Sequence, residues 1–126
     1  MKYGIYQDEL IAYVDVKEFA RGTTMRIDQT RYGRHYADIY GNIYYEDSRN
    51  GVVTKSKTYG QKKVKTMMMN HRVEIKMLMV RAMFPSMKDV LPRNVKYFDG
   101  DAHNNSAENI YVVIPRPKID ERVYPE

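Results

Sequence analysis

Residues 73–84 read VEIKMLMVRAMF, and this stretch decides the fold because it contains neither glycine nor proline. Met, Leu and Ala are strong helix formers. Apolar side chains would cover nearly every face of a helix here, with interruptions at Lys76 and Arg81. A helix that is apolar on most sides is buried on most sides. Pro85, which cannot continue a helix, ends it. The sequence therefore predicts one interior helix over residues 73–84.

Two details of this helix follow from its neighbours. Asn70 is a residue type that caps helices, and His71 is expected to mark the start of the helix. Methionine fills irregular gaps in cores, and a methionine-rich metal site is the weaker interpretation. The methionines concerned are Met77, Met79, Met83 and Met87.

Short strands with close turns are expected before the helix. Three turn signals divide this part of the chain: Gly41-Asn42, Asn50-Gly51 and Tyr59-Gly60. Residues 38–40 and 43–45 would form two strands joined by the first turn. Residues 62–69 could form another strand, and residues 2–16 could be strand or helix.

Two further strands are expected after the helix, at residues 95–98 and 110–114, with a polar turn (99–106, DGDAHNNS) between them. The tail, residues 115–126, is acidic and proline-rich and cannot hold a long helix. Together these elements predict a small α+β fold in one domain over residues 1–126, in which an antiparallel sheet packs on one buried helix.

Composition excludes several classes of protein. The chain has 126 residues, no cysteine and no apolar run long enough to span a membrane. Because the N-terminus lacks the apolar stretch of a signal peptide, a cytoplasmic location is expected. The net charge is +5, and residues 21–70 carry ten Lys or Arg against four Asp or Glu. A basic middle between acidic ends suits a phosphate-bearing partner, and equally a solvated face without one.

Tyrosine is unusually frequent, with twelve copies against three phenylalanines. Six of them are interleaved with Arg and Lys: Tyr32, Tyr36, Tyr40, Tyr44, Tyr45 and Tyr59. Aromatic rings can stack on unpaired bases while cations hold the backbone. Tyrosine also suits a half-buried sheet, which explains most of these residues without a ligand. His35 lies among these residues, and a contact between its side chain and a phosphate is one interpretation of that position.

Residues 95–110 (VKYFDGDAHNNSAENI) resemble the core of the HNH homing endonucleases, the phage-type nucleases of the His-Me finger fold. The residues that carry the match are Asp99-Gly100-Asp101, Asn104-Asn105 and Glu108-Asn109-Ile110. The helix over residues 75–85 is similar to the helix of that family. The resemblance covers residues 36–114 and implies a remnant of the ββα finger, with Asn109 tying its hairpin together.

The departures from the family concern catalysis. The family's general base is a histidine at the position of Tyr97, and a phenol with a pKa of about 10 is a poor base. A metal-holding residue usually stands at Lys96, where a cation would repel the metal. The family's helix histidine is Lys76 here. Its later ligand-bearing helix corresponds to residues 115–118, where prolines would prevent a regular helix. The resemblance therefore implies a degenerate site with no catalytic residue, no metal ligand and no cofactor.

His103 is the one alternative base. It lies in the polar turn beyond Tyr97, where a solvated surface histidine is the ordinary interpretation. If the chain is nevertheless an active nuclease with a displaced site, His103 would serve as the base and a divalent metal would be needed.

The main functional hypothesis is a catalytically inactive HNH-like protein that binds nucleic acid, duplex DNA above all. The expected contacts are Lys55, Lys57, Lys62, Lys63, Lys65, Arg93 and Lys96. On strands, Lys55 and Lys57 would share one face, as would Lys63 and Lys65. Lys96 would then hold a phosphate where the family holds a metal. These lysines could equally be ordinary charges that protect strand edges from aggregation.

A second hypothesis is an interaction protein. HNH-like genes are frequent in bacteriophages, and a disarmed copy could bind or inhibit a protein of the bacterial host. The tyrosine-rich region and the acidic tail would form that interface, because tyrosine is enriched at interfaces.

Overall fold

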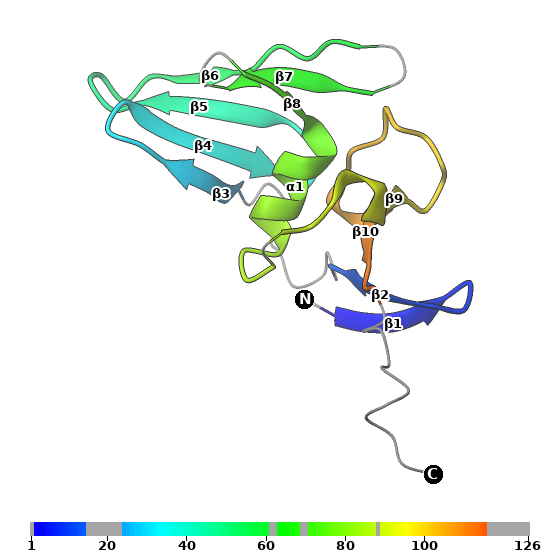
Figure 1. Ribbon diagram of the computed structural model, residues 1–126. Coiled ribbons are helices and arrows are strands. Elements are labelled where there is room, and N and C mark those ends of the chain that lie inside the picture. The colour runs from blue at the N-terminus through cyan, green and yellow to red at the C-terminus, as the bar shows by residue number, and fades with distance from the viewer. Residues whose placement is uncertain (1, 15–23, 61–62, 69–70, 88, 116–126) are drawn as a thin grey trace.

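The computed structural model describes residues 2–14, 24–60, 63–68, 71–87 and 89–115 (Figure 1). Six strands come first: β1 (Lys2–Tyr6), β2 (Glu9–Tyr13), β3 (Thr24–Gln29), β4 (Gly33–Asp38), β5 (Ile43–Asp47) and β6 (Val53–Lys55). The hairpin of β7 (Lys65–Met68) and β8 (His71–Glu74) leads into helix α1 (Ile75–Met83). The 3₁₀ turns η2 (Pro92–Asn94) and η3 (Ala107–Asn109) precede β9 (Val95–Tyr97) and β10 (Ile110–Val113). The predicted α+β class is confirmed.

The strands form three antiparallel sheets. Sheet A has the order β1-β2-β10-β9, so the first strands of the chain pair with the last. Sheet B has the order β3-β4-β5-β6, and β7 with β8 forms sheet C. Sheet A and sheet B lie at opposite ends of the molecule, with α1 between them (Figure 1). The sequence left open whether residues 2–16 form a strand or a helix. Residues 2–13 form the β1–β2 hairpin, and residues 15 and 16 lie outside the described residues.

The helix begins later than predicted because the residues before it belong to a strand. His71 and Val73 lie in β8, and Val73 pairs with Thr66 of β7. The predicted start of the helix at His71 is therefore wrong, and Asn70 lies outside the described residues. Glu74 occupies the N-cap position in an extended conformation, and its side chain makes no capping hydrogen bond to the helix.

One core joins sheets A and B through the helix. Its buried members from α1 are Ile75, Leu78, Met79, Val80 and Met83. They pack with Ala12, Val95 and Ile110 of sheet A and with Ala37 and Ile43 of sheet B. The predicted interior helix is confirmed, as is core filling by methionine: Met77 and Met87 are partly buried against the same cluster.

The turn between β4 and β5 docks on the loop between β9 and β10. The Ala107 backbone N–H donates to the carbonyl oxygen of Ile39 over 2.8 Å. Gly41 has a φ of +87°, and a Cβ atom there would lie 2.5 Å from the Asn105 carbonyl oxygen. Glycine is thus required both by the left-handed backbone and by the close approach of the loop. This contact fixes sheet B against the predicted finger remnant.

Candidate nucleic-acid interface

Tyr97, which the predicted resemblance would place at the position of a general base, is half-buried at the end of β9. Its hydroxyl donates a 3.0 Å hydrogen bond to Oδ1 of Asn105 in the loop that follows. Burial, helped by the negative charges of Glu74 and Asp101, raises the pKa of Tyr97 to about 12. A phenol with this pKa keeps its proton at neutral pH and cannot take one from water.

Lys76, which the predicted resemblance would place at the position of a helix histidine, anchors α1 to the segment before β9. Its ammonium donates to the carbonyl oxygen of Pro92 at 2.9 Å. Glu74 lies 3.6 Å away through Oε2, while its Oε1 lies 3.7 Å from the ammonium of Lys63. The Glu74 carboxylate and the backbone carbonyl groups all face the Lys76 ammonium as acceptors. These charge-assisted contacts explain the lysine as a structural residue.

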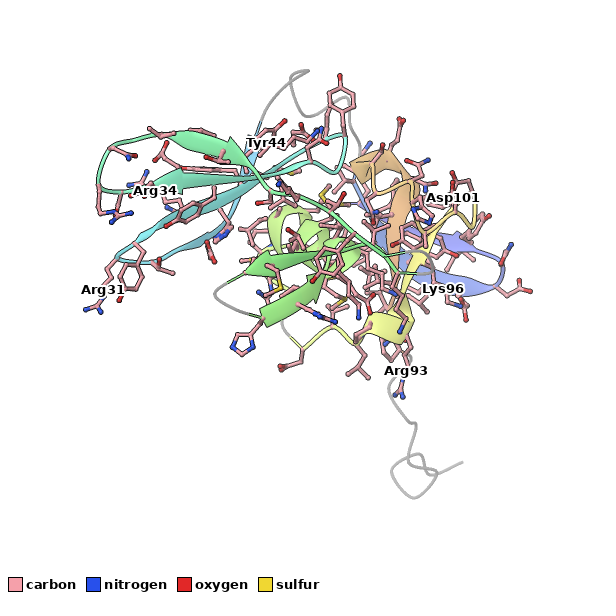
Figure 2. All side chains as sticks on the ribbon, turned by 90° about the horizontal axis from the view of Figure 1, so that it is seen from above. Arg31, Arg34, Tyr44, Arg93, Lys96 and Asp101 are labelled. Carbon is pink, nitrogen blue, oxygen red and sulfur yellow. The ribbon has the colours of Figure 1, made fainter. Side chains whose placement is uncertain are left out.

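Lys96 is exposed and alternates with Tyr97 along β9, so the two side chains lie on opposite faces of the strand. Lys96 pairs instead with Tyr111 of β10. The phosphate contact expected of Lys96 stays a prediction, and it would be made on the face of β9 opposite the Tyr97 side chain. Arg93 is exposed in η2, and Figure 2 shows both cations at the end of the molecule away from Arg34.

The polar loop after β9 is held by its own side chains. Asn109 is buried; its amide donates to Asp99 Oδ1 at 2.8 Å and to the Asn104 carbonyl oxygen at 2.9 Å. Its Oδ1 accepts from the Asp99 backbone N–H. Hydrogen bonds from Asn104, from the backbone and from Asn109 lower the pKa of Asp99. The structural role predicted for Asn109 is confirmed, and His103 is exposed in this loop.

The predicted lysine row is broken up because the strands are shorter than expected. β6 ends at Lys55, so Lys57 lies beyond it, and β7 begins at Lys65, so Lys63 lies before it. Neither pair shares a strand. Lys65 is partly buried and Lys62 lies outside the described residues.

A different basic surface appears on sheet B. Cross-strand pairing places Arg26 beside Tyr36, Tyr36 beside Tyr44, and Tyr44 beside Lys55. Because Ala37 and Ile43, which alternate with these tyrosines, are fully buried, the row lies on the face turned away from the core. Arg34 adds a cation two residues from Tyr36, and Glu46 of β5 lies opposite it on the same face. Its hydrogen bond to Tyr36, with a smaller effect from the charge of Glu46, raises the pKa of Arg34. We call these residues the Arg–Tyr face: Arg26, Arg34, Tyr36, Tyr44 and Lys55.

Tyr44 is fixed in place by a buried carboxylate. Its hydroxyl donates to Oδ2 of Asp38 at 3.0 Å. Burial is the main cause that raises the pKa of Tyr44, and this hydrogen bond is the second. Asp38 also accepts bonds from the Tyr40 N–H and from the backbone and side chain of Asn42. The ring of Tyr44 is thereby positioned before any ligand arrives. Figure 2 shows Tyr44 and Arg34 on this sheet.

The interleaving of Tyr with Arg and Lys indicated this surface in the sequence, but strand register decides which residues share it. Tyr45, next to Tyr44, lies on the other face, where its ring centroid is 4.9 Å from that of His35. Arg26 was missed, because nothing in the sequence shows that β3 pairs with β4 at Tyr36.

No family model, curated protein or solved structure matches this chain. Within the described part of the chain, no three His, Asp or Glu residues are grouped as metal ligands would be. None of the helices described there has the length and apolar character needed to cross a bilayer.

Proposed function

We propose that this protein binds nucleic acid through the Arg–Tyr face and does not cut it. The observation that supports the proposal is the cross-strand row from Arg26 through Tyr36 and Tyr44 to Lys55. Cations at both ends can neutralise phosphates, and each neutralised phosphate releases counterions. The tyrosine rings between them offer surfaces on which bases can stack. The cytoplasmic location expected from the sequence belongs to this proposal.

The loss of cutting is supported by the chemistry around Tyr97. The resemblance to HNH nucleases implies a base there, yet its phenol is protonated and bonded to Asn105. Lys76 replaces the helix histidine with an ammonium that is already held by Glu74 and Pro92. Metal-assisted hydrolysis needs an activated water and a positioned ion, and these two residues supply neither.

Binding is tested by fluorescence anisotropy with labelled duplex and single-stranded oligonucleotides over a range of salt. We expect log K to fall linearly as log salt rises. A flat dependence would reject phosphate contacts.

Two matched double variants locate the surface. Arg34→Glu with Lys55→Glu alters the Arg–Tyr face, while Arg93→Glu with Lys96→Glu makes the same charge change at the other end of the molecule. We expect the first pair to weaken binding at least about tenfold and to flatten the salt slope, because both phosphate contacts become repulsive. A larger loss in the second pair would move the interface to β9.

Residual nuclease activity has its own assay. Plasmid nicking with Mg²⁺ or Mn²⁺, abolished by His103→Ala, would establish the displaced-site alternative. We expect intact plasmid with either metal.

A second candidate function, binding to a host protein, is favoured by one observation. The β1–β2 hairpin carries exposed apolar side chains: Tyr3 and Ile5 are 57% and 70% exposed, and Leu10 pairs with Ile5. Exposed apolar groups of this kind occur at interaction sites. Affinity capture from bacterial lysate, repeated after nuclease treatment, separates the two functions. A protein retained after that treatment and lost in Ile5→Lys would support this candidate.

A further inference from the structure

The core-facing side of sheet B carries a pocket that the Arg–Tyr face does not explain. A pocket of about 580 Å³ opens there, on the side of the sheet opposite the Arg–Tyr face. It is lined by His35, Tyr45, Asp47, Asn50, Val52, Thr54, Ser56 and Met67. Its volume lies within the range of small-molecule sites. The inference drawn from it does not rest on the proposed function.

The pocket is built around a buried histidine that a carboxylate orients. His35 is 6% exposed, and its Nδ1 lies 2.9 Å from Oδ1 of Asp28. The same oxygen accepts the His35 backbone N–H, also over 2.9 Å. A register shift between Arg26 and Asp28 turns Asp28 toward His35, because a bulge re-aims the side chain that follows it.

This geometry sets the hydrogen-bonding character of the pocket. Because Nδ1 of His35 faces Oδ1 of Asp28, Nε2 is the ring nitrogen left for a ligand. Asp47 supplies an acceptor, and Arg49, which pairs with it at 3.0 Å, lowers the pKa of Asp47. None of the described residues that line the pocket is Lys or Arg. Asn50, Thr54 and Ser56 of the lining can each donate or accept. The lining therefore favours a neutral ligand that offers hydrogen-bond donors as well as acceptors, and it disfavours an anion.

The remaining walls suit a flat ring. Tyr45 and the cross-strand partner Thr54 extend the row from His35, while Val52 and the thioether of Met67 provide apolar surface. Aromatic and thioether groups pack well against a planar π-system. We propose that this pocket binds an amino-bearing nucleobase, presented either as a free nucleoside or as an unpaired base of a strand.

The test is an NMR titration of the full chain that follows the ring signals of His35 and Tyr45. Adenosine and inosine form a matched pair, because inosine replaces the amino group with a carbonyl oxygen. We expect adenosine to shift both rings and inosine to bind at least about tenfold more weakly, since an acceptor would face the Asp47 carboxylate. A short oligoadenylate single strand distinguishes a strand from a free nucleoside as the source of the base.

A variant that fills the pocket with a larger side chain, compared with a matched control, separates loss of binding from a folding defect. Thr54→Phe places a ring in the pocket from an exposed edge strand, whereas Val53→Phe adds the same ring on the other face of β6. Adenosine shifts should disappear in Thr54→Phe and persist in Val53→Phe. The proposal is overturned if neither adenosine nor oligoadenylate shifts His35, if inosine binds equally well, or if Thr54→Phe binds like the unmodified chain. Loss of oligonucleotide binding in the Arg34→Glu/Lys55→Glu variant would leave it unaffected.

Discussion

The Tyr97 hydroxyl and the Asn105 side chain are joined by a 3.0 Å hydrogen bond across the loop that links β9 to β10. Asn105 is buried, and its amide donates in turn to the carbonyl oxygen of Ala102. Its backbone oxygen meets Gly41 of the β4–β5 turn. Tyr97 therefore ties β9 to the loop that follows it, and this loop in turn contacts sheet B.

Removing that hydroxyl should weaken the fold. Tyr97→Phe leaves Oδ1 of buried Asn105 without its donor, which costs about 1–2 kcal/mol of unfolding free energy. Urea denaturation followed by circular dichroism measures the loss. Tyr3→Phe removes the same atom from a residue that is 57% exposed and should stay within about 0.5 kcal/mol of the unmodified chain. Equal effects in both variants would contradict the structural role of Tyr97.

Alkali should destabilise the protein through the same phenol. The pKa of Tyr97 is about 12 in the folded chain against an ordinary value of 10.0, so the folded state holds this proton more tightly. The stabilisation is complete below about pH 10 and is lost as the pH rises toward 12. Urea unfolding should therefore show a steeper alkaline decline for the unmodified chain than for Tyr97→Phe. Parallel declines would reject the raised pKa of Tyr97.

The loop after β9 depends on Asn109, whose buried side chain bonds to Asp99 and Asn104. Asn109→Ala removes three hydrogen bonds made by a buried side chain and leaves a space in its place, for a loss of about 2–3 kcal/mol. The neighbouring Glu108 is exposed, so Glu108→Ala should change stability by less than about 0.5 kcal/mol. Thermal unfolding of the two variants provides the comparison. A mild effect of Asn109→Ala would mean that the backbone alone holds the loop.

Local signals predicted much of this fold. Glycine-centred turns at Gly41 and Gly51 are formed, and the apolar stretch at residues 75–83 is the buried helix. The helix start was misplaced because residues 71–74 satisfy their backbone by pairing with β7. The apolar pattern of residues 71–74 does not show whether they pair with β7 or begin the helix.

The candidate sites were harder to predict because they depend on register. A shift of one residue would move Tyr44 from the Arg–Tyr face to the pocket beside His35. The bulge that brings Asp28 to His35 has no sequence signal of its own. Spacing in the sequence therefore identified the residue types at these surfaces but not the members of each face.

The contact between the β4–β5 turn and the β9–β10 loop can be isolated with two glycines. Gly41 and Gly51 have φ values of +87° and +70°, so alanine at either position adopts a left-handed backbone at a cost of roughly 1 kcal/mol. At Gly51 the new Cβ meets nothing within 4 Å, whereas at Gly41 it lies 2.5 Å from the Asn105 carbonyl oxygen.

Because that neighbour is backbone held by the Ala107–Ile39 hydrogen bond, it cannot move aside cheaply. Gly41→Ala should lower the free energy of unfolding by roughly 1–3 kcal/mol more than Gly51→Ala, as overpacking does elsewhere. Urea denaturation of both variants measures the difference. If the two alanines cost the same, the close approach of the turn to the loop does not contribute to stability as the structure implies.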